Sequence, residues 1–136
     1  MVLVVDASMV LGWFFPDETK PAAEAARRQF ATTGAVVPAL WWFEVRNALI
    51  VGERRERIDV TQTAEILAQL VALPIHIDRE PDGDAVMALA RAHRLTFYDA
   101  AYLELARRLD APLGTLDRHL TAAARAAAVP LLGEEA

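Results

Sequence analysis

The chain has 136 residues, a formal net charge of −5 at pH 7 and no cysteine. Its length suits one domain around one core, so we expect residues 1–136 to form a single domain. The lack of cysteine excludes disulfides, thiolate catalysis and cysteine-ligated zinc. The sequence contains no recognisable leader and no apolar run long enough to cross a membrane, which predicts a soluble, cytoplasmic protein.

The first elements follow from short apolar runs and the residues that stop them. The β-branched run at residues 2–5 predicts a buried strand that ends at Asp6. Asp6 is placed to cap a short helix, which Pro16 stops. We predict a second helix at residues 22–31 and a second strand at residues 35–37.

The middle of the chain predicts two helices and one strand. The longest helix covers residues 39–57, and a helix capped by Thr61 follows at residues 62–71. Residues 73–77 predict a strand. Pro74 cannot donate a hydrogen bond to a neighbouring strand, so this strand belongs at an edge or begins there.

The last third predicts three helices, at residues 83–92, 98–109 and 118–128, and two short strands, at residues 113–116 and 129–132. Asp117 precedes the final helix and is placed to cap it. Strands that alternate with helices along a whole chain predict a parallel sheet with helices on both faces. The fold class is therefore α/β, in three layers.

Four acidic residues lie where this fold would bring them to one edge of the sheet. They are Asp6 after the first strand, Glu44 in the long helix, Asp99 at a helix start and Asp117 after a short strand. Ligands of open parallel sheets bind beyond the carboxyl ends of the strands. Gathered carboxylates repel unless a hard cation holds them, so the pattern predicts Mg²⁺ or Mn²⁺ and metal-assisted phosphodiester chemistry.

Each acid alone also has a structural explanation. Asp6 and Asp117 could serve only as helix caps, and Asp99 could serve only the helix dipole. Glu44 lies in a helix that is apolar nearly all round, which marks a buried helix more firmly than it marks the glutamate. Only the occurrence of all four together favours a site. The three histidines fall at no metal-ligand spacing.

The charge limits the kind of nucleic-acid contact. A net charge of −5 argues against a long basic groove. Thirteen of the 14 basic residues are arginine, which binds phosphate in a bidentate manner. A weak, local grip on RNA fits this composition better than an extended one.

Four sequence strings carry a family resemblance. In chain order they are VVDAS at residues 4–8, EVRNAL at 44–49, YDAAYLELA at 98–106 and LDRHL at 116–120. With these strings the chain resembles the PIN-domain ribonucleases and, within them, the VapC-like toxins of toxin–antitoxin pairs. The likeness runs from about residue 2 to residue 132, and residues 96–120 are its most specific part.

The resemblance implies a PIN fold, Mg²⁺- or Mn²⁺-dependent cleavage of RNA, a VapB-like antitoxin and a homodimer. It implies a metal-binding and catalytic quartet at Asp6, Glu44, Asp99 and Asp117. Thr115 and Ser8 match common hydroxyl positions that support such a site. Ala7 departs from the pattern, because family members often carry Ser or Thr directly after the first Asp.

Three alternative functions compete with the nuclease. A degenerate PIN domain could act only as a binding or dimerisation module, but no acid of the quartet is lost. A haloacid-dehalogenase-like phosphatase requires a second Asp where Ser8 stands. A response-regulator receiver requires a Lys after a late strand, whereas the only Lys is Lys20.

Six large aromatic residues fall in two runs: Trp13, Phe14, Phe15, Trp41, Trp42 and Phe43. Either all of them belong to the core, or some line a groove. In the second case we expect the groove to receive an apolar antitoxin segment, with a basic side chain that reaches the acidic site.

Overall fold

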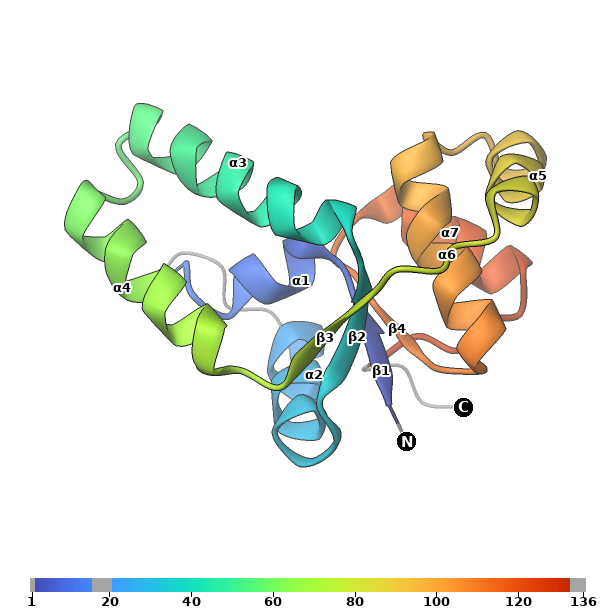
Figure 1. Cartoon of the computed structure of the whole chain (residues 1–136), viewed down its shortest axis with the longest axis horizontal. Coiled ribbons are helices and arrows are strands. Elements are labelled where there is room, and N and C mark those ends of the chain that lie inside the picture. The colour runs from blue at the N-terminus through green and yellow to red at the C-terminus, as the bar shows by residue number, and fades with distance from the viewer. Residues whose placement is uncertain (1, 16–20, 133–136) are drawn as a thin grey trace.

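The sheet lies at the centre of the molecule. The computed structural model describes residues 2–15 and 21–132. The strands are β1 (Leu3–Val5), β2 (Ala35–Pro38), β3 (Ile75–Asp78) and β4 (Leu113–Gly114). All pairings are parallel and the order is β3-β2-β1-β4 (Figure 1). The predicted parallel sheet is confirmed, and the strand after Pro74 lies at an edge, as its proline requires.

Helices cover both faces of this sheet. They are α1 (Ala7–Gly12), α2 (Pro21–Thr33), α3 (Leu40–Arg54), α4 (Val60–Ala72), α5 (Gly83–His93), α6 (Phe97–Leu109) and α7 (Arg118–Ala126). Figure 1 shows α5 to α7 on one side and α1 to α4 on the other, with α3 and α4 projecting as a pair. None of the helices in the described part of the chain is long and apolar enough to span a membrane.

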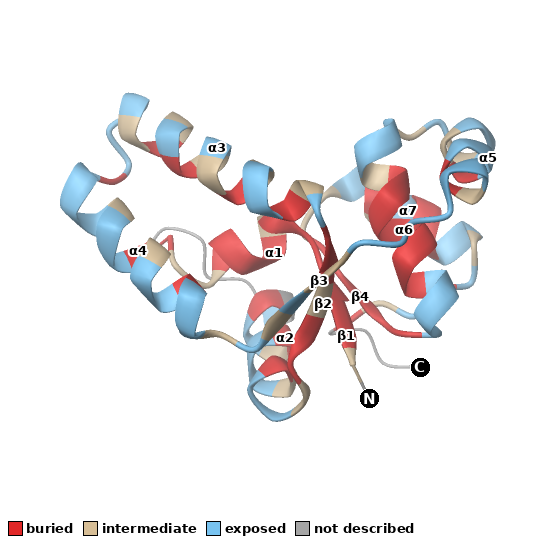
Figure 2. Ribbon diagram, in the orientation of Figure 1, coloured by how far each residue is buried: buried red, intermediate tan, exposed pale blue. Residues whose placement is uncertain are grey.

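Burial follows these layers. The three residues of β1 are fully buried, and Figure 2 shows buried residues gathered on the strands and on the helix faces that meet them. β1 is central because it pairs with both β2 and β4. The carboxyl end of β1 leads directly into α1, and the end of β4 leads through a short turn into α7. Residues at these two junctions are therefore held by the most buried part of the fold.

Several predicted boundaries need correction. The helix predicted at residues 39–57 ends at Arg54, and the strand predicted at residues 113–116 ends at Gly114. The cap of α4 is Asp59 and not Thr61, because Asp59 accepts from the Gln62 backbone N–H at 2.7 Å while the Gln62 side chain accepts from the Asp59 N–H. The predicted strand at residues 129–132 is reduced to one bridge between Leu113 and Leu131, since Pro130 has no N–H to donate. Helix α1 already ends at Gly12, and Pro16, which was predicted to stop it, lies outside the described residues.

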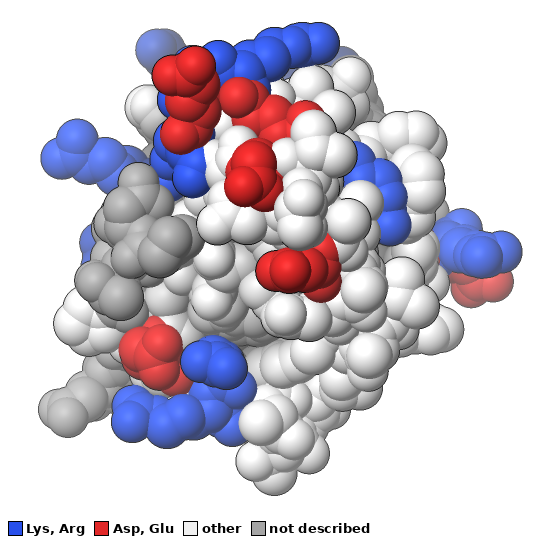
Figure 3. All heavy atoms as spheres, turned by 90° about the vertical axis from the view of Figure 1, so that its left-hand side faces the viewer, with Lys and Arg blue, Asp and Glu red and all other residues white. Residues whose placement is uncertain are grey.

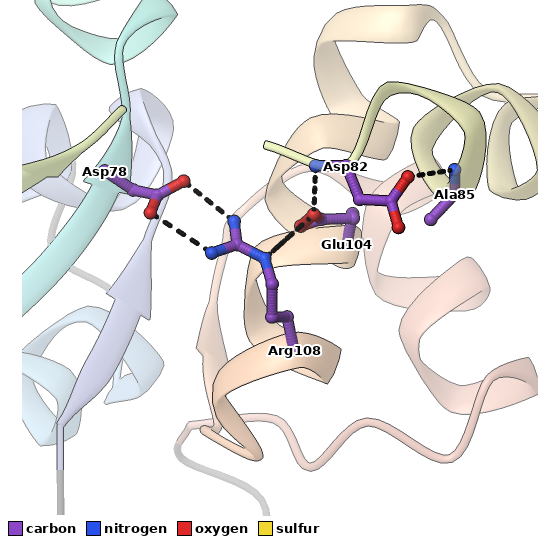
Figure 4. A network of polar contacts seen from close by, with 5 residues as sticks. All are labelled: Asp78, Asp82, Ala85, Glu104 and Arg108. Carbon is purple, nitrogen blue, oxygen red and sulfur yellow. Dashed lines mark hydrogen bonds and ion pairs between the residues drawn. The ribbon is translucent and has the colours of Figure 1, made fainter. Parts of the chain in front are cut away.

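A polar network holds the connection between β3 and α5 against α6 (Figure 4). The Arg108 guanidinium donates to both Asp78 carboxylate oxygens, at 2.7 and 3.2 Å, and its Nε donates to Glu104 at 2.9 Å. Glu104 is buried and also accepts from the Asp82 backbone N–H at 2.9 Å. The hydrogen bonds from Arg108 lower the pKa of the Asp78 carboxyl.

Arg108→Ala is expected to lower the free energy of unfolding by about 2 kcal/mol, because it leaves the buried Glu104 carboxylate without its charged partner. Urea denaturation measures this loss. Arg107→Ala is the matched control, since Arg107 is an exposed residue in the same last turn of α6. Equal losses in the two variants would mean that the network contributes nothing beyond the interaction with the helix dipole.

Candidate active site

Asp6 is the most deeply buried of the predicted site residues, with 6% of its surface exposed. It follows β1 and caps α1, accepting from the Met9 backbone N–H at 2.9 Å. The Ser8 hydroxyl donates to the same carboxylate at 2.7 Å, and the Thr115 hydroxyl donates to its other oxygen. Burial raises the pKa of Asp6 to about 6, although these hydrogen bonds oppose the rise.

The two predicted supporting hydroxyls join the β1–α1 junction to the turn after β4. Thr115 donates to Asp6 and accepts from the Asp117 backbone N–H at 3.0 Å. Ser8 donates to Asp6 and accepts from the Leu116 backbone N–H at 2.9 Å. Both side chains therefore contact Asp6 and fix the turn that carries Asp117. Their contact with Asp6 explains why hydroxyl residues suit these two positions.

Asp117 lies at the end of this turn and caps α7. Its Oδ1 accepts from the Leu120 backbone N–H at 2.8 Å, so the predicted cap is confirmed. A residue can cap a helix and face a site at the same time, because the cap engages one of two carboxylate oxygens. The charge of Asp117 raises the pKa of both Asp6 and Asp99. Thr115 also joins the Asp6 carboxylate to the Asp117 backbone N–H.

Glu44 and Tyr102 connect α3 to α6. The Tyr102 hydroxyl donates to Glu44 Oε1 at 2.6 Å, and Tyr102 is almost fully buried. Burial raises the pKa of Glu44, and the charges of Asp6 and Asp99 raise it further. Burial and the adjacent Glu44 also raise the pKa of the Tyr102 hydroxyl, which keeps its proton for the hydrogen bond.

The sequence pattern assigns no role to Tyr102, although this residue lies inside the YDAAYLELA string. Only its spacing from Asp99 could have indicated a role for Tyr102. Tyr102 follows Asp99 by three residues, so both lie on the same side of α6. Its partner Glu44 is 58 positions away in the sequence, and no local pattern identifies that pairing.

Asp99 lies half-buried in the first turn of α6 but does not cap the helix. Thr96 is the cap, accepting from the Asp99 backbone N–H at 3.1 Å. Burial raises the pKa of the Asp99 carboxyl, and the charge of Asp117 adds to this, whereas His119 opposes it. Asp99 is therefore partly buried and lies near another acid. An aspartate that served only the helix dipole would require neither of these features.

The structure therefore brings all four predicted acids to the same edge of the sheet. The charge of Asp117 raises the pKa of Asp6 and of Asp99, and the charges of Asp6 and Asp99 raise the pKa of Glu44. Within the described residues, no three acidic or histidine side chains converge closely enough to enclose a metal ion. The donors are carboxylate oxygens, which suit Mg²⁺ and Mn²⁺, and a cation among them would relieve their repulsion.

A groove of about 530 Å³ begins beside this edge, between α1 and α3. Ser8 and Leu116 line it near the acids, Phe15 and Val51 contribute apolar surface, and Arg55 is among its basic residues. Of the six aromatic residues considered in the sequence, Phe15 lines this groove and Trp41 is buried. Trp13 and Phe14 are partly buried, and Trp42 and Phe43 are exposed.

Tyr102→Phe is expected to weaken Mn²⁺ binding at neutral pH about 10-fold, since the lost hydrogen bond lets the pKa of Glu44 rise further. Isothermal titration calorimetry with Mn²⁺ measures this change. Tyr98→Phe is the control, because it removes a hydroxyl from an exposed tyrosine one turn earlier on α6. An unchanged Mn²⁺ affinity in Tyr102→Phe would show that the hydrogen bond from Tyr102 does not contribute to metal binding by Glu44.

Comparisons with known proteins agree with this fold. The model of the PIN domain family matches residues 3–126. Ribonuclease VapC3 of Pyrobaculum aerophilum is 37% identical over 124 residues, which cover 88% of this chain and 92% of the relative.

Two solved structures share the architecture. The crystal structure of PAE2754 from Pyrobaculum aerophilum has a TM-score of 0.70 and 28% identity, covering 90% of this chain and 84% of that one. A toxin–antitoxin complex from Klebsiella pneumoniae has a TM-score of 0.59 at 17% identity, covering 85% of this chain and 86% of the other, and shows likeness of fold alone. The family match over most of the chain and the 37% identity to a curated relative lead to one conclusion: the chain belongs to the PIN domain family.

Proposed function

We propose that this chain is a Mg²⁺- or Mn²⁺-dependent endoribonuclease and the toxin of a toxin–antitoxin pair. Its metal-binding and catalytic residues are Asp6, Glu44, Asp99 and Asp117. The observation that carries the proposal is the position of these four residues at one edge of the sheet, where Tyr102 on α6 donates to Glu44 on α3 and Thr115 joins the Asp6 carboxylate to the backbone of Asp117. A relative at 37% identity bears the name of a ribonuclease and supports RNA as the substrate.

Hydrogen bonds from neighbouring side chains orient two of the four carboxylates. Ser8 and Thr115 fix the Asp6 carboxylate, and Tyr102 fixes Glu44. Asp99 is oriented by the first turn of α6. A bound divalent ion supplies activation of water and neutralisation of charge on the phosphate. No side chain is needed as a nucleophile, so hydrolysis depends on how the carboxylates are positioned.

We further propose that residues 1–136 form a single PIN domain that acts in the cytoplasm as a homodimer. A VapB-like antitoxin is the proposed inhibitor. The groove between α1 and α3 offers a place for it, because apolar Phe15 and Val51 line the groove and Ser8 lies at its end next to Asp6. An antitoxin segment in this groove would bring a basic side chain to the acidic edge.

The test is cleavage of an unstructured RNA by the purified protein with Mn²⁺, Mg²⁺, Ca²⁺ or EDTA. We expect cleavage with Mn²⁺ and Mg²⁺, none with EDTA, and inhibition by the product of an adjacent antitoxin gene. A folded protein that binds Mn²⁺ but cuts no RNA would favour the degenerate binding module. A protein that neither binds metal nor cuts RNA would refute the site as well.

A further inference from the structure

The groove between α1 and α3 changes its chemistry along its length. Ser8, whose hydroxyl donates to Asp6, lines the end at the acidic edge of the sheet. Leu11 and Val51 give the groove apolar walls on its two sides. Arg55 lines the opposite end, because α3 begins beside the sheet and projects away from it to Arg55, its C-cap (Figure 1).

One side of α3 carries this change in order along the helix. At intervals of four, three and four residues, which place side chains on the same side of a helix, it carries Glu44, Ala48, Val51 and Arg55. The last three line the groove, and Glu44 belongs to the acidic edge. From Glu44 to Arg55 the helix rises by about 16 Å. This wall is therefore acidic at one end, apolar in between and basic at the other end.

The Arg55 guanidinium is accessible to a partner. Arg55 is exposed, and within the described part of the chain its side chain forms no ion pair and no hydrogen bond. Figure 3 shows basic and acidic side chains interspersed on the face where α3 and α4 project. The carboxylates near Arg55 border a separate hollow, at Glu53, Glu56 and Asp59. None of the described residues that line the groove is acidic, so an acidic side chain entering at this end meets Arg55 without a competing carboxylate in the groove.

Phe15 forms an apolar floor near the same end of the groove. A Cβ added at Gly52 would lie 3.2 Å from two atoms of the Phe15 ring, and the Arg57 guanidinium lies 4.4 Å from the ring centroid. The walls are helices, which offer no open backbone edge to an extended strand. A helix satisfies its own backbone N–H and C=O groups and can lay an apolar face on such a floor. The groove therefore fits an amphipathic helix.

We propose that Arg55 binds an acidic side chain of the antitoxin and thereby fixes the direction in which an antitoxin helix lies in this groove. The inference rests on the proposed function and adds the chemistry that the partner must carry. The helix has a basic side chain at the acidic edge, apolar side chains over Phe15 and Val51, and an acidic side chain at Arg55, about 11 residues from the basic one. The reverse direction would bring like charges together at both ends and weaken binding.

A second copy of the chain fits this groove less well. In the part of the chain that the structure describes, no helix other than α3 carries an acidic residue and an arginine 11 residues apart. The α3 helix of a second copy lines a groove of its own, so the two copies would meet hollow to hollow. Two facing hollows pack poorly, whereas a stable interface needs complementary shapes.

The test measures Kd for labelled helical peptides of about 16 residues by fluorescence anisotropy. The first peptide has an arginine and a glutamate about 11 residues apart, with leucines between them on the same face. In two further peptides glutamine or lysine replaces the glutamate. All three are made in both sequence orders, and the order that binds the wild type more tightly is used.

We expect Arg55→Glu to raise Kd of the glutamate peptide about 10-fold and to lower Kd of the lysine peptide, because the charge at the end of the groove is reversed. The glutamine peptide should change by less than about 2-fold. Arg54→Glu is the matched control, since Arg54 is the exposed neighbour of Arg55 and is not among the residues that line the groove. It should leave the order of the three affinities unchanged.

An equal Kd for the glutamate peptide in the wild type and in Arg55→Glu would overturn the inference, as would failure of every peptide to bind the wild type. If Arg55→Glu raises KM for RNA and leaves the peptide Kd unchanged, Arg55 contacts the substrate instead. If it only dissociates a dimer in sedimentation, a second copy occupies the groove and the inference fails. A protein that binds the peptides in the expected order but cuts no RNA would refute the proposed nuclease and leave the role of Arg55 intact.

Discussion

Asp99→Asn is expected to slow divalent-dependent RNA cleavage by at least about 100-fold and to abolish growth arrest when the chain is expressed without its antitoxin. Asparagine keeps the size of the side chain but removes the negative charge that a hard cation requires. The fold should remain intact. Asp99 does not cap α6, and its pKa is raised by burial and by Asp117, so loss of its charge costs at most about 1 kcal/mol.

Asp84→Asn is the matched control for this experiment. Asp84 is also an aspartate in a first helical turn, in α5, but it is exposed and lies outside the quartet. Cleavage rates under single-turnover conditions and circular dichroism of both variants complete the comparison. A folded Asp99→Asn protein that cuts RNA at the wild-type rate would remove Asp99 from the site and leave it a role in the helix dipole alone.

Divalent metal is expected to raise the melting temperature, by about 10 °C when its concentration is about 100 times Kd. The effect should be larger at pH 7.5 than at pH 4.5. Burial raises the folded-state pKa of Asp6 to about 6, against about 3.9 in the unfolded chain. Between these values the folded state binds more protons, so the free energy of unfolding falls as pH rises.

Above pH 6 the full penalty of the charged Asp6 is present, and it amounts to about 3 kcal/mol. The raised pKa values of Glu44 and Asp99 act in the same direction. Thermal unfolding in EDTA and in Mn²⁺ at the two pH values measures both effects. Asp6→Asn should be less sensitive to pH in EDTA, because its side chain no longer ionises. A wild-type melting temperature that no divalent ion changes at pH 7.5 would argue against a metal among these acids.

The order of strands and helices along the sequence was sufficient to predict the architecture. Apolar strands alternating with helices predicted a parallel sheet between helical layers, and the structure confirms it. Asp6 and Asp117 cap the helices that they were predicted to cap. These inferences succeed because caps and strand ends depend on neighbours within a few residues. The same order of elements predicts Asp6, Asp99 and Asp117 at one edge of the sheet, whereas the position of Glu44 depends on how the long helix crosses that edge. The metal-binding and catalytic roles of all four stay predictions.

The wrong boundaries arise where a sequence pattern leaves two possibilities and a specific hydrogen bond decides between them. Asp59 and Thr61 are both able to cap α4, and the reciprocal bond with Gln62 decides for Asp59. The last strand was predicted from an apolar run, but pairing needs N–H donors in register with β4, and Pro130 lacks one. In both cases the pattern identified the segment, and one or two hydrogen bonds decided where the helix begins or whether the strand pairs.

By itself, the sequence determined the fold class and the two aspartates that follow strands and cap helices, Asp6 and Asp117. Only the tertiary structure decided that Tyr102 holds Glu44 and that Arg108 joins Asp78 to Glu104. It also decided which aromatic rings face water, since adjacent rings in one apolar run all look like core. These contacts join residues from separate elements, and their geometry depends on how the layers pack, which no periodicity within one segment records.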